Sequence, residues 1–109
     1  MKTDRWITSF KVTALPKLLE TFKPVKILLF GSRAKGTATE DSDLDIIIVS
    51  DFFEPIPFLE RMPIVLKLIA FPKHVDIICY SEKEFLNLKN KSSILIDALK
   101  HGIELHATS

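Results

Sequence analysis

Short apolar runs separated by polar segments divide the chain into strands and helices. Three runs rich in Val, Ile and Leu have the length and composition of buried strands. Longer segments with apolar residues at helical spacing predict helices, and one helical turn is expected directly after the first strand. The expected strands are 25–30, 44–49 and 74–80, and the expected helices are 14–22, 32–35 (the single turn), 55–71, 81–88 and 93–101. This order predicts an α/β domain with a small mixed β-sheet and flanking helices.

Local signals refine the ends of these elements. Ser81 followed by Glu84 forms a capping box at the start of a helix. Pro63 falls inside the longest expected helix and should kink or split it. Gly102 is expected to end the last helix as its C-terminal stop. We expect the opening residues, up to about Phe10, to be loosely held.

The connections predict how the strands are oriented. A crossover helix between the second and third strands normally makes them parallel. If the first two strands are antiparallel neighbours, the end of the first, at Gly31, lies beside the start of the second, at Asp43. Residues at these strand ends would then share one edge region of the sheet.

Length and composition narrow the class of protein. The 109 residues predict a single domain, 1–109, with a core of about 14–104. A net charge of only +1 argues against a nucleic acid partner, because each neutralised phosphate needs a cation. The single cysteine, Cys79, lies in an apolar run and is expected to be a buried thiol. We find neither a signal peptide nor an apolar segment near the roughly 20 residues that span a bilayer, so we expect a cytoplasmic protein with no membrane partner.

Three aspartates stand near the starts of two expected strands. Asp43 and Asp45 are two residues apart, so their side chains project from the same face of a strand. Two adjacent negative charges repel each other, and a divalent cation that prefers oxygen ligands, such as Mg²⁺, removes that penalty. Asp76 lies near the start of the third strand and is the only acid in an otherwise apolar run. Three acids at one end of a sheet could hold two metal ions roughly 3.5–4 Å apart.

The segment after the first strand has the composition of a phosphate-binding loop. Gly31 has no side chain to block the approach of a phosphate, and Ser32 offers a hydroxyl group. The opening turn of a helix presents free N–H groups to an anion. Arg33 and Lys35 add positive charge nearby. These four residues are therefore candidates for binding the phosphates of a nucleotide.

Together these motifs resemble the signature of the DNA polymerase β-like nucleotidyltransferase superfamily. The similarity is closest to the small prokaryotic minimal nucleotidyltransferase (MNT) domains and extends from about residue 25 to 102. Residues 31–36 (GSRAKG) correspond to the family's opening motif, with Lys35 where arginine is more usual. Residues 42–46 (SDLDI) correspond to its double-aspartate strand, and 75–78 (VDII) to the strand of its third carboxylate. The resemblance implies a polymerase β-like palm fold.

The resemblance also implies a role for each site residue. Asp43 and Asp45 would bind two Mg²⁺ ions, with Mn²⁺ as an alternative, and Asp76 would bind the ion that activates the acceptor. Asp76 would also take the proton of the acceptor hydroxyl. Gly31 and Ser32 would hold the pyrophosphate that leaves when the acceptor attacks the α-phosphorus of an NTP.

The same resemblance implies a substrate and a partner. It points to transfer of AMP from ATP onto a protein, by an antitoxin whose partner is a helical toxin of the HEPN type, in some pairs onto a tyrosine. A domain of this size has little structure to hold an acceptor, which favours a separate protein in that role. Apolar residues over 52–59 and 62–71 exceed what one buried stripe requires, so we expect some of them to form an interface. A homodimer through this surface is one alternative, and capping of the sheet edge is another.

Each motif also has an ordinary structural explanation. Gly31 and Ser32 could form only a turn and a helix cap, the paired aspartates could be a solvated strand entrance, and Asp76 could pair with a buried cation. An inactive relative that binds nucleotide, or only a partner protein, is therefore the alternative function. The histidines show no metal-ligand spacing with one another, so we assign them no catalytic role; they are His74, His101 and His106.

Overall fold

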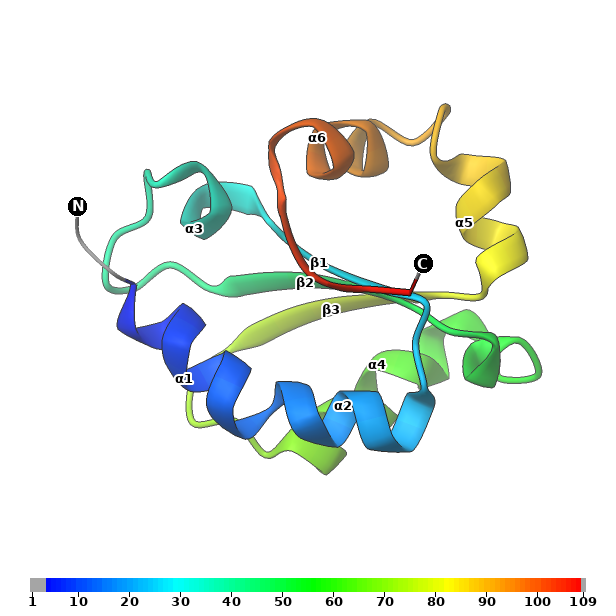
Figure 1. Ribbon diagram of the computed structural model, residues 1–109, viewed down its shortest axis with the longest axis horizontal. Coiled ribbons are helices and arrows are strands. Elements are labelled where there is room, and N and C mark those ends of the chain that lie inside the picture. The colour runs from blue at the N-terminus through cyan, green and yellow to red at the C-terminus, as the bar shows by residue number, and fades with distance from the viewer. Residues whose placement is uncertain (1–3, 109) are drawn as a thin grey trace.

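The computed structural model describes residues 4–108, which fold around one four-stranded sheet (Figure 1). The strands lie in the order β3-β2-β1-β4. Their bounds are β1 Lys26–Phe30, β2 Leu44–Val49, β3 Val75–Tyr80 and β4 Ile103–Ala107. β1 pairs antiparallel with both β2 and β4, whereas β2 and β3 are parallel, as the crossover predicted. The expected α/β class, with a small mixed sheet and flanking helices, is confirmed.

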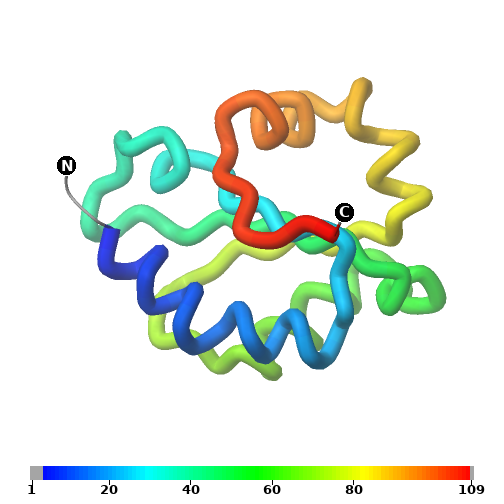
Figure 2. The backbone as a smooth tube through the Cα atoms, viewed as in Figure 1, coloured from blue at the N-terminus to red at the C-terminus, as the bar shows by residue number. Residues whose placement is uncertain are grey.

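Helices cover both faces of this sheet (Figures 1 and 2). α1, α2 and α4 lie on one face, α5 and α6 lie on the other, and the short α3 follows the end of β1. The bounds are α1 Arg5–Thr13, α2 Leu15–Phe22, α3 Gly31–Lys35, α4 Phe58–Ile69, α5 Glu82–Leu88 and α6 Ser93–His101, with a 3₁₀ turn over Asp51–Phe53. Within residues 4–108, no helix combines the length and the apolar character that crossing a bilayer demands.

Alternate residues of the strands fill two separate cores. In β2, Leu44 and Ile46 are fully buried in the larger core, on the side of α1, α2 and α4. Ile47 and Val49 belong to the smaller core, on the side of α5 and α6. Because side chains alternate along a strand, Asp45 shares the face of Ile47. The face that carries α5 and α6 is therefore the one that carries the predicted acids.

The N-terminal segment is packed, contrary to its sequence-based prediction. Asp4 caps α1 by accepting hydrogen bonds from the backbone N–H groups of Trp6 and Ile7. Phe10 is 1% exposed and belongs to the larger core. The expectation of a loosely held segment up to about Phe10 is therefore wrong for residues 4–10, and the packed region begins before residue 14. Residues 1–3 and 109, which the expectations also included, lie outside the described residues.

The last strand, β4, was missed, and Gly102 serves a purpose that the sequence did not indicate. α6 ends at His101, as predicted, but Gly102 has an ordinary extended backbone with φ of −77°. A Cβ at this position would lie 2.3 Å from the carbonyl oxygen of Ala98 and 2.7 Å from that of Leu29. Glycine therefore allows the end of α6 to approach β1 closely, which sets up the pairing of β4 with β1.

The ends of the remaining helices follow local chemistry. Ser81 and Glu84 form the expected capping box of α5. α4 runs without interruption from Phe58 to Ile69, so Pro63 does not split it. This helix is shorter than the expected 55–71 because it starts after Pro57 and stops at Ala70, which adopts a left-handed conformation with φ of 44°.

Candidate active site

The end of β1 and the start of β2 meet at a contact between Gly31 and Asp45. Phe30 pairs with Asp45 in the antiparallel register, which brings the next residue, Gly31, against the Asp45 side chain. Gly31 has φ of +75°, and a Cβ here would lie 2.2 Å from Asp45 Oδ2. Glycine satisfies both the backbone conformation and this close approach. The first residue of the predicted phosphate loop thus touches one of the predicted metal ligands.

The other two predicted acids lie on either side of Asp45. The parallel register places Asp76 of β3 directly opposite Asp45. Asp43 lies two residues before Asp45, immediately ahead of β2. The three carboxylates therefore share one end and one face of the sheet.

His74 joins this cluster, although the sequence analysis assigned it no role. Its Nε2 atom lies 3.1 Å from Asp76 Oδ1 and 3.9 Å from Asp43 Oδ2. Potential ligand atoms of Asp43, His74 and Asp76 all lie within 4.8 Å of one another. The available signal was the two-residue spacing of His74 and Asp76 at the start of a strand, which puts both on one face. A comparison of the histidines only with one another could not detect it.

The electrostatics of the cluster favour a bound cation. Burial raises the pKa of the Asp45 carboxyl, and the negative charges of Asp76 and Asp43 raise it further, while His74 acts in the opposite direction. The ionised carboxylates therefore repel one another when no cation is present. Several carboxylate oxygens and one imidazole nitrogen form a donor set that suits a divalent ion. The residues present thus fit the metal that the resemblance implies.

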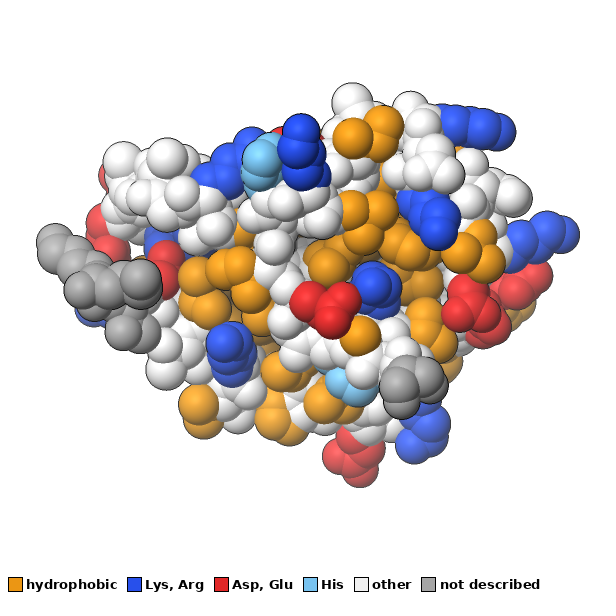
Figure 3. Space-filling model, turned by 45° about the horizontal axis from the view of Figure 1, so that its top comes forward, with side chains coloured by type: hydrophobic (Ala, Val, Ile, Leu, Met, Phe, Trp, Pro, Cys, Tyr) orange, Lys and Arg blue, Asp and Glu red, His pale blue; other side chains and the backbone are white. Residues whose placement is uncertain are grey.

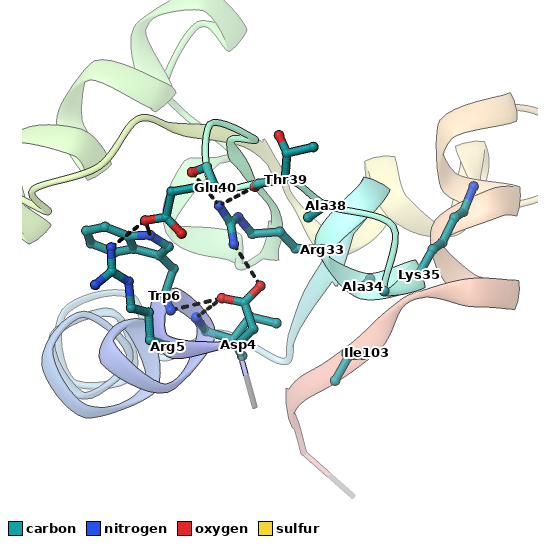
Figure 4. A pocket seen from close by; sticks show the side chains of 12 residues that line it. Asp4, Arg5, Trp6, Arg33, Ala34, Lys35, Ala38, Thr39, Glu40 and Ile103 are labelled. Carbon is teal, nitrogen blue, oxygen red and sulfur yellow. Dashed lines mark hydrogen bonds and ion pairs between the residues drawn. The ribbon is translucent and has the colours of Figure 1, made fainter. Parts of the chain in front are cut away.

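Arg33 holds the loop that leads into the acids. It is 6% exposed, and its Nη1 lies 2.7 Å from Asp4 Oδ2 (Figure 4). The guanidinium also donates hydrogen bonds to the carbonyl oxygens of Thr39, Glu40 and Ser42. Its donors are directed at the protein itself, so the structure supports a role in positioning this loop, and direct binding of the nucleotide by Arg33 stays a prediction.

The remaining predicted nucleotide-binding residues lie on α3. Lys35 Nζ is 3.1 Å from Asp97 Oδ2, in a half-exposed ion pair that connects α3 to α6. The carbonyl oxygen of Ser32 accepts hydrogen bonds from the backbone N–H groups of Gly36 and Thr37, which closes the short helix. A role of Ser32 and Lys35 in holding phosphate stays a prediction.

A pocket of about 690 Å³ opens between the start of α1, α3 and the start of β4 (Figure 4). Trp6, Arg33 and Glu40 are among its lining residues, and Trp6 Nε1 donates a hydrogen bond to Glu40 Oε1 at 3.2 Å. None of the three aspartates lines it. We therefore centre the candidate site on the three carboxylates, where the acids lie beside the loop that starts at Gly31, and not on this pocket.

A glycine loop packed against carboxylates at one end of a mixed sheet is an arrangement suited to a class of proteins that handle nucleotide phosphates, because such carboxylates could hold a divalent cation beside the phosphates. Comparison with known proteins specifies the family. Residues 13–103 match the family described as "Nucleotidyltransferase domain". The chain therefore belongs to the nucleotidyltransferase domain family.

Curated relatives match parts of the chain. A Methanocaldococcus jannaschii protein named "Putative protein adenylyltransferase MJ0126" is 46% identical over 44 residues, covering 40% of this chain and 43% of that protein. "Putative protein adenylyltransferase MJ0604" of the same organism is 65% identical over 26 residues, covering 24% and 26%. "Caffeine-induced protein 16" of Schizosaccharomyces pombe is 32% identical over 71 residues, covering 62% of this chain and 6% of that protein. Each match spans less than half of the relative's own length.

Two solved structures confirm the fold. A crystal structure described as a putative nucleotidyltransferase from Sulfolobus solfataricus has a TM-score of 0.59 and 21% identity, covering 94% of this chain and 87% of that one. A structure described as a toxin-antitoxin with AMP-PNP has a TM-score of 0.61 and 24% identity, covering 91% and 74%. At these identities the likeness establishes the nucleotidyltransferase fold alone.

Proposed function

We propose that this domain transfers AMP from ATP to a hydroxyl group of an acceptor protein and releases pyrophosphate. The observation that carries the proposal is the contact of Gly31 with Asp45, with Asp43 and Asp76 beside it. It joins a loop with no side chain in the path of a phosphate to carboxylates that need a cation. Membership of the nucleotidyltransferase domain family supports the same reaction class.

In the proposed reaction the acceptor oxygen attacks the α-phosphorus of ATP. A new O–P bond forms, the bond between the α-phosphorus and the bridging oxygen breaks, and pyrophosphate leaves with that oxygen. Asp76 receives the proton of the acceptor hydroxyl. Gly31 and Ser32 face the leaving pyrophosphate, while Arg33 keeps the loop in place through its bonds to Asp4 and to the loop carbonyls.

Asp43, Asp45 and Asp76 would hold the divalent ions, two in number and Mg²⁺ or Mn²⁺ in identity. Such ions neutralise the triphosphate and make the acceptor oxygen a better nucleophile. The raised pKa of Asp45 supports a cation at this position, because the carboxylates repel one another without it.

We propose further that the acceptor is a partner protein, specifically a helical toxin of the HEPN type that the domain inactivates. The names of the two Methanocaldococcus jannaschii relatives support a protein acceptor, the toxin-antitoxin neighbour supports a toxin partner, and the HEPN type rests on the sequence resemblance. Exposed apolar side chains on α4 support a protein contact; they are Phe58 (50% exposed), Leu59 (86%), Met62 (38%) and Ile64 (40%), and we call them the α4 surface.

The decisive experiment combines the domain with the protein encoded beside it, ATP and Mg²⁺ or Mn²⁺. We expect release of pyrophosphate and a gain of one AMP by the partner, measured by intact mass. Asp43→Asn should lower the rate at least about 100-fold, because the charge that anchors the cation is lost. The matched control is Asp41→Asn, which removes an exposed acid of the same loop and should stay within about twofold.

The alternative function, an inactive module that binds nucleotide or only a partner, makes a different prediction. Such a protein would bind ATP or the partner and release no pyrophosphate in this assay. Retention of Gly31, Asp43, Asp45 and Asp76 in one cluster favours the active transferase.

A further inference from the structure

We propose that His74 is a nitrogen ligand of the divalent ion that Asp43 and Asp76 hold. We further infer that this imidazole shifts the preference of the site from Mg²⁺ towards a first-row transition ion such as Mn²⁺. The inference rests on the proposed function and assigns that site a fourth residue, one outside the motifs of the sequence.

The distances in the cluster suit a common ion. His74 Nε2 is 3.1 Å from Asp76 Oδ1 and 3.9 Å from Asp43 Oδ2. Adjacent ligands of an octahedral ion with bonds of about 2.1 Å lie about 3.0 Å apart. The first distance already fits, and the second needs a shift of under about 1 Å. Side chains that are 64% and 44% exposed, as those of His74 and Asp43 are, can make that adjustment.

The backbone fixes His74 on the correct side of the sheet. It lies two residues before Asp76, so both side chains leave the same face. Its carbonyl oxygen accepts a hydrogen bond from the backbone N–H of Leu44 at 3.3 Å, which ties it to the start of β2. Leu44 is the residue between Asp43 and Asp45, so the bond anchors the histidine beside both strand-borne acids.

The donor set is what makes the inference specific. Mg²⁺ takes oxygen ligands and retains several of its waters, so a nearby imidazole adds little to its binding. First-row transition ions accept imidazole nitrogen together with carboxylate oxygen. A site with one imidazole among its carboxylates should therefore bind Mn²⁺ with a larger advantage over Mg²⁺ than the carboxylates give alone.

A simpler role for His74 would be that of a hydrogen-bond partner that screens the acids when no metal is present. In that role it would compete with the metal, and its removal would leave metal binding unchanged or strengthen it. Ligation predicts the opposite sign. The direction of the change in metal affinity therefore separates the two roles.

The test measures binding of the metal alone to the folded chain, with no turnover required. Free Mn²⁺ is followed by its electron paramagnetic resonance signal at about pH 8, where an ordinary imidazole is neutral, and Mg²⁺ is measured by competition. We expect His74→Ala to weaken Mn²⁺ binding about tenfold or more and Mg²⁺ binding by less than about threefold. His101→Ala, which removes an exposed histidine at the end of α6, is the matched control and should change neither.

A second readout locates the metal. Substoichiometric Mn²⁺ should broaden the ring resonances of His74 in proton spectra more strongly than those of His106, which lies at the opposite end of β1 beside Pro24 and Ile27. Unchanged or tighter Mn²⁺ binding by His74→Ala, or equal losses for both ions, would overturn the inference.

The outcome also distinguishes this inference from the proposed function. If Asp43→Asn abolishes Mn²⁺ binding and His74→Ala does not weaken it, the transferase site stands and the inference fails. If the wild-type chain binds Mn²⁺ no better than Asp43→Asn does, the inference fails together with the metal-binding part of the proposed function.

Discussion

The space that a side chain would fill at Gly31 is occupied by the carboxylate of Asp45. A Cβ at Gly31 would lie 2.2 Å from Asp45 Oδ2 and 3.1 Å from Asp45 Cγ. The positions of the loop that starts at Gly31 and of the strand that carries Asp45 are therefore coupled, because neither can move towards the other. Gly31 thus sets the distance between the residues proposed to hold phosphate and those proposed to hold metal.

Gly31→Ala should weaken nucleotide binding as well as stability. Alanine at φ of +75° costs about 1–2 kcal/mol in free energy of unfolding, and its Cβ would also displace the Asp45 carboxylate. We expect binding of ATP with Mg²⁺, measured by calorimetry, to fall about tenfold or more.

Gly36→Ala is the matched control for this change. Gly36 has φ of +77°, but a Cβ there would meet no atom within 4 Å. The variant therefore carries the same backbone strain without the displacement of Asp45. Equal losses of ATP binding in the two variants would show that the contact of Gly31 with Asp45 does not contribute to ATP binding.

Asp45→Asn should remove activity without unfolding the domain. Asparagine has nearly the same shape, so the contact with Gly31 survives, while repulsion with Asp43 and Asp76 is relieved. In the presence of EDTA at neutral pH we expect an unchanged or raised Tm, by about 4 °C for each kcal/mol gained. A Tm well below that of the wild type would assign Asp45 to stability instead of catalysis.

Substitution of Arg33 should lower stability much more than substitution of Lys35. Arg33→Met leaves Asp4 and the loop carbonyls without their buried partner and should cost about 2–4 kcal/mol of unfolding free energy. Lys35→Met removes a half-exposed pair with Asp97 and should cost under about 1 kcal/mol. If Lys35 holds phosphate, Lys35→Met should weaken ATP binding while its Tm stays near that of the wild type, whereas any loss of ATP binding by Arg33→Met should come with a lowered Tm.

The sequence predicted most of the sheet because three of its four strands carry strong local signals. β1, β2 and β3 are apolar runs, and the helical crossover determined that β2 and β3 are parallel. β4 carries a weaker signal, an alternation of apolar and polar residues over only five positions, and its pairing with β1 depends on the close approach that Gly102 allows. α1 was missed because the burial of Phe10 depends on tertiary packing against the larger core.

The site residues also fall into two groups: those that the sequence could predict and those that only the structure reveals. The spacing of Asp43, Asp45 and Gly31 follows from strand geometry, so these positions were accessible from the sequence. The interaction of Arg33 with Asp4 joins residues far apart in the chain. Only the folded structure reveals that the guanidinium of Arg33 donates its hydrogen bonds within the protein. His74 was overlooked because its partners are aspartates on two strands and not other histidines.

Glu84 should make part of the stability depend on pH. The hydrogen bonds of the buried Arg61 guanidinium hold the pKa of Glu84 below its ordinary value, with Nη1 to Oε1 at 2.6 Å. For a carboxyl with a lowered pKa in the folded state, the stabilisation is fully present above the ordinary glutamate pKa of about 4.5 and is lost as the pH falls through the lowered value. Urea unfolding should therefore show a larger deficit of Glu84→Gln against the wild type at about pH 7 than at about pH 3.

Glutamine at this position keeps the capacity to cap α5, so the variant tests the charge. Because Glu84 is partly exposed, we expect a deficit of about 1 kcal/mol at neutral pH. Glu82→Gln, at an exposed position of the same helix turn, is the control and should show no such pH-dependent deficit. A deficit of Glu84→Gln that is the same at both pH values would contradict the charge-based explanation.

The α4 surface is where the proposed toxin partner would contact the domain. Phe58 of the α4 surface packs near Tyr80, with ring centroids 6.0 Å apart, at the end of β3 opposite to Asp76. Tyr80 lies four positions after Asp76 in β3, roughly 13 Å away at the usual rise per residue. The α4 surface and the carboxylates lie on opposite faces, but β3 is an edge strand. An interface of ordinary size, roughly 800 Å² on each partner, can therefore cover the α4 surface and reach the carboxylates around this edge.

A second group of exposed apolar side chains lies on the face of α5 and α6 (Figure 3), including Leu86 at 54% and Leu99 at 42%. We expect Leu59→Lys to weaken the complex with the toxin at least about tenfold, because a charge is placed in a desolvated contact. Leu86→Lys is the matched control and should leave affinity within about threefold. Size-exclusion chromatography and calorimetry with the co-expressed partner would measure both. Loss of binding with Leu86→Lys alone would move the interface to the face that carries the acids, and loss with neither variant would remove both apolar surfaces from the contact.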